Sequence, residues 1–217
     1  MPITPHTDLF PADCQADTAS LIGEISPNAQ QVILLLDRLG RLTRELQFVE
    51  GLNPAQWETL RFLAQANRYS RTPTALAEYL GATKGTVSQT LISLESKGLV
   101  DRCKKTCDRR QVAITLTEAG EAMLRRDPMR ALEKSICSMT ADCGGAMVTG
   151  LSRLLTELQH RREVMHFGVC EDCTMFCAEH GKPKTTDNEP KRCGMTGETL
   201  NDGECRQLCV NYKGAAE

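Results

Sequence analysis

The stretch that most constrains the fold is a pair of short helices predicted between residues 72 and 98. Thr72 is a good N-cap for the first helix, and Gly81 is a typical helix stop. Thr83 caps the second helix, which runs until Gly98 ends it. Two short helices joined by a tight, glycine-containing turn form a helix-turn-helix.

Two short segments rich in branched residues, Leu99–Arg102 and Gln111–Leu116, follow this helix pair. The residues between them, 103–110, are polar and basic, as expected for the tip of a hairpin. A hairpin directly after a helix-turn-helix is the wing of a winged helix. The sequence therefore predicts a mainly α fold with a winged helix-turn-helix at its centre.

Further helices flank this centre. Apolar residues recur at three- and four-residue spacing over residues 26–50, and shorter helices are expected over residues 53–66 and 118–126. A last long helix is expected over residues 142–165, and Cys137 and Cys143 are expected to be core or boundary residues in helical stretches. Long apolar helices outside a compact core need a partner, so we expect a homodimer formed through the N- and C-terminal helices.

This pattern divides the chain into three parts. Residues 1–25 are expected to be a flexible leader. Residues 26–167 are expected to form the winged-helix dimer domain, with a DNA-binding core at about residues 53–116. Residues 168–217 form a cysteine-rich tail with too little apolar periodicity to build its own core.

The net charge of −2 conceals a strong asymmetry along the chain. Residues 1–67 carry a net charge of −4, residues 68–126 carry +5, and residues 127–217 carry −3. A basic centre between acidic flanks is the pattern expected when only the centre faces a polyanion.

The second helix of the pair has a face suited to a DNA major groove. Its polar side is small or hydrogen-bonding and lacks acidic residues, which allows close approach to base edges. The wing tip adds cations that could reach the minor groove or the backbone. The predicted DNA-binding residues are Thr83, Lys84, Thr86, Ser88, Gln89, Lys104, Lys105, Asp108, Arg109 and Arg110, and Ser93 is expected on the same helix side.

Two segments within residues 75–120 resemble the MarR family of bacterial winged-helix regulators. They read ALAEYLGATKGTVSQTLISLESKGLVDR and DRRQVAITLTEAG. The resemblance implies a homodimeric, sequence-specific DNA-binding regulator that binds a near-palindromic site in double-stranded DNA. We expect this regulator to be a repressor. It also implies that Asp108 orients Arg110 towards the DNA, and that a small-molecule effector is possible.

The tail holds six of the chain's eleven cysteines within its last 48 residues. Cys170 and Cys173 have the Cys-x2-Cys spacing of a metal-binding knuckle. Cys193 is followed by Gly194, which could let backbone amides approach a thiolate, and Cys209 is expected near the end of a short helix over residues 202–210. The predicted metal ligands are Cys170, Cys173, Cys193 and Cys209, with Cys177 and Cys205 in reserve and His180 as a more remote candidate.

The identity of the metal stays open at this point. One short-spaced pair followed by two separated cysteines fits either Zn²⁺ or an iron–sulfur cluster as cofactor. Cys103 and Cys107 bracket the wing tip beside basic residues that would favour their thiolates, so they are reserve redox candidates.

Several function classes are excluded or made less favourable by the sequence. No apolar run approaches the roughly 20 residues of a membrane span, and no secretory signal is recognisable, so we expect a cytoplasmic protein. No phosphate loop, nucleophile–base pair or convergent carboxylates indicate an enzyme. The main hypothesis is a DNA-binding regulator responsive to metal, iron–sulfur or redox state. The alternatives are a small-molecule-responsive regulator with a structural zinc tail and, more remotely, a thiol-dependent redox enzyme.

Overall fold

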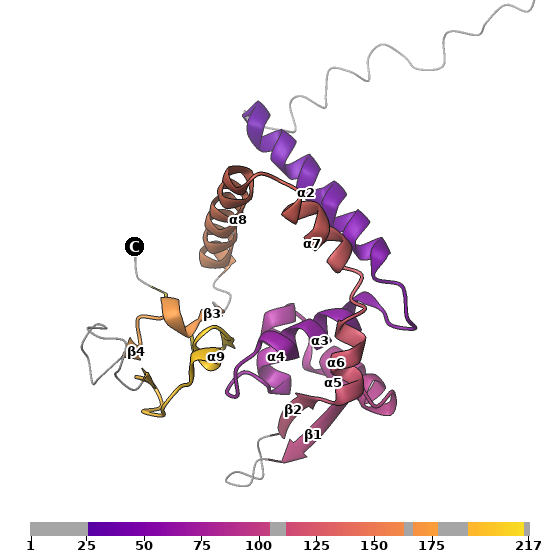
Figure 1. The fold of residues 1–217 in the computed structure, drawn as a ribbon, viewed down its shortest axis with the longest axis vertical. Helices are drawn as coiled ribbons and strands as arrows, with labels where there is room; N and C mark the ends of the chain where they lie inside the picture. Colours follow the sequence, from indigo (N-terminus) through magenta and orange to yellow (C-terminus); the bar gives the residue numbers. More distant parts are fainter. Residues whose placement is uncertain (1–25, 105–111, 163–166, 178–190, 215–217) are drawn as a thin grey trace, which may run out of the picture. The chain divides into compact units, whose positions relative to one another are not determined.

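The computed structural model describes residues 26–104, 112–162, 167–177 and 191–214. The chain divides into two units, residues 1–45 and residues 46–217. The described helices are α2 (Pro27–Leu46), α3 (Pro54–Gln65), α4 (Pro73–Leu80), α5 (Lys84–Ser96), α6 (Glu118–Leu124), α7 (Arg130–Cys137), α8 (Ala141–Arg162), the 3₁₀ turn η2 (Cys170–Asp172) and α9 (Asp202–Cys205) (Figure 1). The described strands are β1 (Val100–Lys104), β2 (Val112–Leu116), β3 (Gly168–Val169), β4 (Phe176–Cys177), β5 (Arg192–Cys193) and β6 (Leu208–Cys209).

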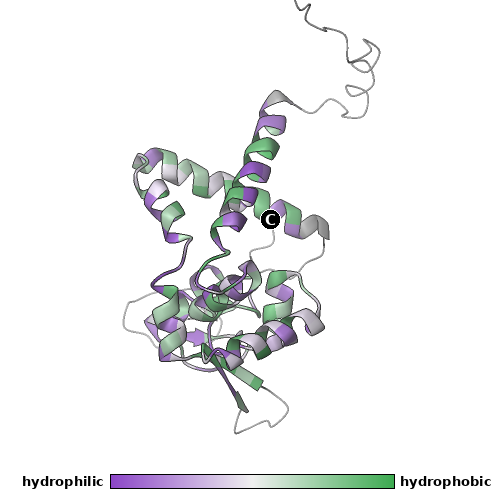
Figure 2. Ribbon diagram, turned by 90° about the vertical axis from the view of Figure 1, so that its right-hand side faces the viewer, coloured by the Kyte–Doolittle hydropathy of each residue, from purple (hydrophilic) through white to green (hydrophobic). Residues whose placement is uncertain are grey.

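Helix α2 exposes a long series of apolar side chains. Leu34, Leu35 and Leu39 are 68%, 53% and 48% exposed, and the hydrophobic residues are visible along the helix that follows the grey N-terminal trace (Figure 2). This helix ends at Leu46, four residues earlier than the sequence predicts. Gln47, the next residue, is no longer helical. Its side chain is buried and accepts a hydrogen bond from Arg61.

The winged-helix lobe has one continuous core built from α3, α4, α5 and the wing strands. Trp57 and Leu60 of α3 pack against Leu91 and Leu94 of α5, and all four are fully buried. Burial of each such side chain contributes about 1.5–3 kcal/mol. This core holds α5 in a fixed orientation against the rest of the lobe.

The helix starts of the lobe are those that the sequence predicts. The Thr72 side chain accepts a hydrogen bond from the amide of Ala75, and the Thr83 side chain accepts one from the amide of Thr86. Gly81 ends α4 in the left-handed conformation, at φ 59°. The helix-turn-helix is therefore confirmed in type and position.

The predicted wing is also confirmed as an antiparallel hairpin. Strands β1 and β2 pair with Val100 opposite Leu116 and Lys104 opposite Val112. The Ile114 side chain on β2 is fully buried in the lobe core. The hairpin is thus fixed at its base, and its tip, residues 105–111, lies outside the described residues.

The C-terminal helices follow the predicted order. Thr117 caps α6, and the chain passes Pro128 before α7 begins at Arg130. Helix α8 exposes apolar side chains, including Val148 at 66% and Leu155 at 57%. Cys137 and Cys143 are exposed rather than buried, so the prediction that they are core or boundary residues is wrong for a single chain.

The tail is built from very short elements. Strand β3 pairs with β6, and β4 pairs with β5, both antiparallel. The structure corrects the predicted helix over residues 202–210: α9 ends at Cys205, and Cys209 lies in strand β6 opposite Gly168. If the helix continued to Cys209, the backbone hydrogen bonds between β6 and β3 could not form. Cys170, Leu200, Cys205 and Cys209 form a small buried cluster of the tail.

Candidate nucleic-acid interface and cysteine cluster

The first candidate site is the outer face of α5. Its buried side, Val87 with Leu91 and Leu94, faces the core, and the opposite side is solvent-exposed. Lys84 and Gln89 are exposed on that side, and the first turn of α5 contains no acidic residue. The N-terminal half of α5 itself therefore presents no like charge to a polyanion.

Hydrogen bonds fix the smaller polar residues of this face. The hydroxyls of Thr83 and Thr86 lie 2.9 Å apart and hydrogen-bond to each other. The backbone carbonyl of Ser88, a half-buried residue, accepts a long 3.4 Å hydrogen bond from Arg102 of β1. Ser93 differs from the sequence-based expectation, because its hydroxyl accepts a 2.9 Å hydrogen bond from the Gln56 side chain and faces α3.

The structure places only part of the predicted wing contacts. Lys104 is the last described residue of β1, where it pairs with Val112. The predicted contacts Lys105, Asp108, Arg109 and Arg110 lie outside the described residues, as does Cys107. Cys103 is exposed on β1 opposite Ala113.

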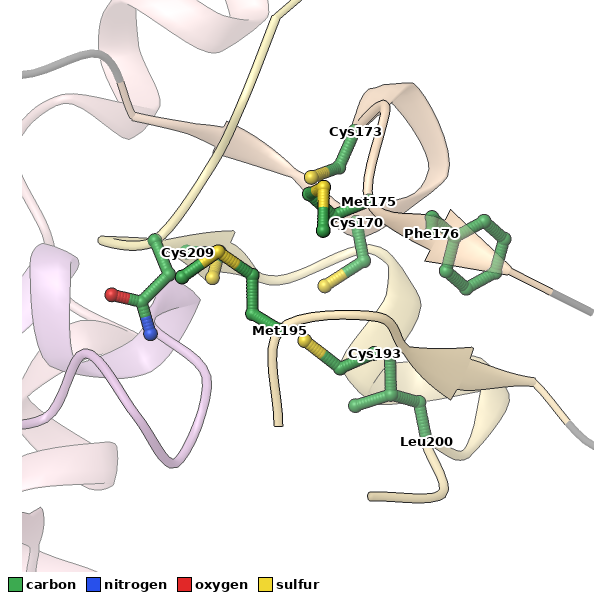
Figure 3. A pocket seen from close by; sticks show the side chains of 9 residues that line it. Cys170, Cys173, Met175, Phe176, Cys193, Met195, Leu200 and Cys209 are labelled. Carbon is green, nitrogen blue, oxygen red and sulfur yellow. The ribbon is translucent and has the colours of Figure 1, made fainter. Parts of the chain in front are cut away.

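The second candidate site is a cavity in the tail. The four cysteines that the sequence singles out as ligands, Cys170, Cys173, Cys193 and Cys209, all line this one cavity (Figure 3). They come from η2, the residue after it, β5 and β6. The remaining lining is largely apolar and includes Met175, Phe176, Met195 and Leu200.

Two of these thiols are joined by a hydrogen bond. The Cys170 thiol donates a hydrogen bond to the Cys209 sulfur, which raises the pKa of Cys170 and lowers the pKa of Cys209 to about 6. The side chain of Asn67 and the backbone of Asn211 also lower the pKa of Cys209. Cys209 is thus the thiol of this pair that gives up its proton first.

Backbone amides also approach the cavity sulfurs. The Lys213 amide donates a hydrogen bond of 3.4 Å to the sulfur of Cys173. The amide of Gly194 itself donates to the Met175 carbonyl at 2.7 Å and not to a sulfur. That bond instead holds β5 beside the segment that carries Cys173.

The reserve cysteines lie elsewhere. Cys205 is fully buried in the tail cluster but does not line the cavity. Cys177 lies in β4 opposite Arg192, and His180 is outside the described residues. Within the part of the chain that the structure describes, no three His, Cys, Asp or Glu side chains are already arranged to hold a metal ion.

Sequence reasoning missed the loop that receives the tail, residues 66–71. Arg68 forms ion pairs with Glu198 at 3.1 Å and Glu204 at 3.3 Å and donates to the Thr199 carbonyl at 2.8 Å. Tyr69 hydrogen-bonds to Glu198 through its hydroxyl. These partners are about 130 positions apart in the sequence, and no local motif announces such contacts.

A second cavity lies in the winged-helix lobe. It has a volume of about 320 Å³ and is lined by residues of α3, β2 and α6 together with Arg71. Leu63, Leu116 and Leu124 supply apolar surface, and Glu121 lies at the same cavity.

Comparison with known proteins finds a family and relatives that are similar to the winged-helix lobe. The model of the MarR family matches residues 50–111. The central segment of this chain, a winged helix-turn-helix in the structure, is therefore similar to the MarR family over these residues. Over 76 residues the chain is 34% identical to the HTH-type transcriptional repressor YetL of Bacillus subtilis (strain 168), a match that covers 35% of this chain and 46% of that repressor.

Two further proteins are similar to parts of this chain. An HTH-type transcriptional regulator of Mycobacterium tuberculosis (strain CDC 1551 / Oshkosh) is 31% identical over 86 residues, covering 39% of this chain and 60% of that regulator. The transcriptional regulator BldR from Sulfolobus solfataricus shares the fold, with a TM-score of 0.51 at 20% identity over 63% of this chain and 99% of that one. The curated matches are to transcription regulators and not to enzymes, and each covers less than two thirds of the relative's length.

The match to the MarR family model ends at residue 111 and so does not include the cysteine tail. No described helix is long and apolar enough to cross a membrane.

Proposed function

We propose that this protein is a DNA-binding regulator of transcription, a repressor, that acts as a homodimer on a near-palindromic site. The observation that carries the proposal is the exposed face of α5, in which Lys84 and Gln89 project from a buried scaffold with no acidic residue in the first turn. The names of the relatives, which are transcription regulators, support the same function.

The geometry of a winged-helix dimer defines the expected site. Each α5 enters one major groove, so the half-sites lie about one helical turn apart. The homodimer is supported by the exposed apolar residues of α2 and α8, because a water-exposed leucine series of this kind gains free energy when a second copy covers it.

Selection from a random pool of double-stranded oligonucleotides tests this function. The selected site is expected to be near-palindromic, and Gln89→Ala is expected to relax its sequence preference because a groove-facing amide reads base edges. Ser96→Ala, at the exposed far end of the same helix, is the control. Failure to enrich any sequence, or an unchanged preference in Q89A, would contradict the proposal.

We further propose that the tail holds a thiophilic metal centre, either Zn²⁺ or an iron–sulfur cluster, through Cys170, Cys173, Cys193 and Cys209. Three observations support the fit: the four sulfurs face one cavity, the Lys213 amide donates to Cys173, and apolar side chains shield the space. Thiolates are the ligands that both kinds of centre prefer. A bound centre would fold and cross-link these short elements and, as a cluster, could also respond to redox state.

Anaerobic purification followed by an absorption spectrum and analysis of zinc, iron and sulfide tests the metal centre. Iron with sulfide and visible absorbance would identify a cluster, whereas a colourless sample with about one zinc per chain would identify a structural site. Cys209→Ser is expected to lose the metal, and Cys143→Ser, an exposed cysteine of α8, is expected to keep it. Wild-type protein without metal would contradict the proposal.

A small-molecule effector is the second candidate for the regulatory signal. The cavity beside Arg71 has a volume of about 320 Å³, which is within the usual range for small-ligand sites, about 300–1,000 Å³. Its leucines would contact an apolar body, and the Arg71 guanidinium would attract an anionic group. A change in DNA affinity on adding aromatic carboxylates to metal-stripped protein would favour this candidate.

A further inference from the structure

The strand that carries Cys209 is held on both sides by one loop of the winged-helix lobe. The Asn67 amide donates a hydrogen bond of 2.9 Å to the carbonyl of Leu208, the residue before Cys209. The amide of Val210, the residue after it, donates one of 2.8 Å to the hydroxyl of Ser70. Cys209 is therefore positioned directly by the lobe.

The oxygen and the nitrogen of the Asn67 side chain differ in their hydrogen bonding. Its oxygen accepts hydrogen bonds from the Tyr69 amide at 3.1 Å, the Ser70 amide at 3.1 Å and the Ser70 hydroxyl at 2.8 Å. Since backbone amides only donate, these bonds settle which end of the side chain is the oxygen. The Asn67 nitrogen, Nδ2, is buried in a fully buried residue and makes no hydrogen bond of normal length and angle to any described residue.

A buried amide nitrogen without an acceptor costs about 1–3 kcal/mol, so a ligand-dependent acceptor beside it would be stabilising. Cys209 is the cysteine nearest to Asn67 along the docked strand, because the residues on either side of it, Leu208 and Val210, hydrogen-bond to the loop that carries Asn67. A metal-bound thiolate is a stronger acceptor than a protonated thiol, because it carries negative charge. Metal binding to the tail would thus supply a hydrogen-bond acceptor for the Asn67 nitrogen.

We propose that Asn67 is a positioning residue that donates a hydrogen bond from Nδ2 to the Cys209 sulfur when the tail binds its metal, and that the lobe senses metal loading through this bond. This inference rests on the metal centre proposed above. It adds a residue outside the tail, and outside every cysteine motif, to the site.

The same loop continues to the wing. The Arg71 side chain donates to the Ala66 carbonyl at 2.9 Å, and the Arg71 carbonyl accepts a 2.9 Å hydrogen bond from the amide of Ile114 in β2. A change in loop 66–71 therefore reaches the base of the wing through consecutive hydrogen bonds. By linkage, metal binding and DNA binding then alter each other's affinity by the same factor.

Asn67→Asp is the variant that tests the donor. The carboxylate keeps the oxygen that the loop amides need but replaces the Nδ2 donor with an oxygen that repels a thiolate. Metal affinity, measured by competition with a chromophoric chelator for Zn²⁺ and Co²⁺, is expected to fall about 10- to 100-fold. The thiolate-to-cobalt charge-transfer band is expected to shift, which a purely structural role would not cause.

Asn53→Asp is the matched control, because it makes the same substitution at the exposed N-cap of α3, where a carboxylate oxygen can still accept from the Gln56 amide. It is expected to keep the wild-type charge-transfer band and metal affinity. If N67D and wild type bind metal with equal affinity and identical bands, the role of Asn67 is refuted while the metal centre stands. If neither binds Co²⁺, Zn²⁺ or a reconstituted iron–sulfur cluster, the metal centre itself is refuted.

A measurement on wild-type protein covers the case in which N67D does not fold. The side-chain amide signals of Asn67, in ¹⁵N-labelled protein, are expected to shift and to become protected from hydrogen exchange on loading with Zn²⁺. Signals that stay unchanged while the metal binds would overturn the inference.

Discussion

The amide of Ile114 donates a hydrogen bond of 2.9 Å to the carbonyl of Arg71, which joins wing strand β2 to the loop that receives the tail. Ile114 is fully buried in the lobe core, so this contact lies between the base of the wing and the centre of the lobe. A displacement of loop 66–71 would therefore act on the base of the wing through this hydrogen bond.

Arg71→Ala should loosen this connection. The Arg71 guanidinium holds the loop by donating to the Ala66 carbonyl at 2.9 Å, and a hydrogen bond of this kind contributes about 0.5–1.5 kcal/mol. Hydrogen exchange at the Ile114 amide is therefore expected to be faster in R71A than in wild type. Arg153→Ala, an exposed arginine of α8, is the control. Equal exchange in R71A and R153A would show that the loop does not depend on the Arg71 side chain.

Lys84→Ala should weaken DNA binding at all sequences and not at one base pair. Lys84 is exposed at the start of α5, where an ammonium group meets phosphates and displaces counterions. The slope of log affinity against log salt is expected to decrease by about 1. Anisotropy titrations at several salt concentrations measure it, with Lys134→Ala on α7 as the control. An unchanged slope in K84A would remove Lys84 from the interface.

The lobe was predictable because its signals are local. Thr72, Thr83 and Thr117 each accept a hydrogen bond from an amide three residues ahead, so the cap and its helix lie within one short stretch of sequence. The glycine at position 81 likewise ends its own helix. Such pairs of neighbouring residues determine the helix ends with little help from the rest of the chain.

The tail was less predictable because its structure depends on distant residues. The position of Cys209 in a strand is set by Gly168, and the docking of Val210 is set by Ser70, 140 positions away. The four cysteines predicted as metal ligands line one cavity, and their role as ligands stays a prediction. The spacing of the cysteines gave no sign of Asn67, which is an ordinary polar loop residue until the tail lies against it.

Leu35→Glu should oppose dimer formation. Leu35 is 53% exposed on α2, within a series of exposed leucines, and a carboxylate placed under a second copy would have to be desolvated without a partner. Sedimentation velocity is expected to show a smaller species for L35E than for wild type. Gln31→Glu introduces the same charge at an exposed polar position of α2 and serves as control. A dimer that persists in L35E would place the interface elsewhere.

Gly120→Ala should destabilise the lobe. Gly120 lies in the first turn of α6, where the chain passes the end of α5 and the start of β1, and a Cβ added there would lie 2.1 Å from the backbone carbonyl oxygen of Leu99. A backbone atom cannot move aside as a flexible side chain can, so α6 would have to shift, at a cost of about 1–3 kcal/mol. Thermal unfolding followed by circular dichroism is expected to show a lower midpoint.

Gly144→Ala is the matched control for this prediction. Gly144 lies in α8 with no atom within 4 Å of an added Cβ, and alanine in a helix interior is more stable than glycine by about 0.5–1 kcal/mol. The midpoint of G144A is therefore expected to equal or exceed that of wild type. If G120A unfolds at the wild-type temperature, α6 does not pack against the Leu99 backbone, and the wing is not braced by α6 at that point.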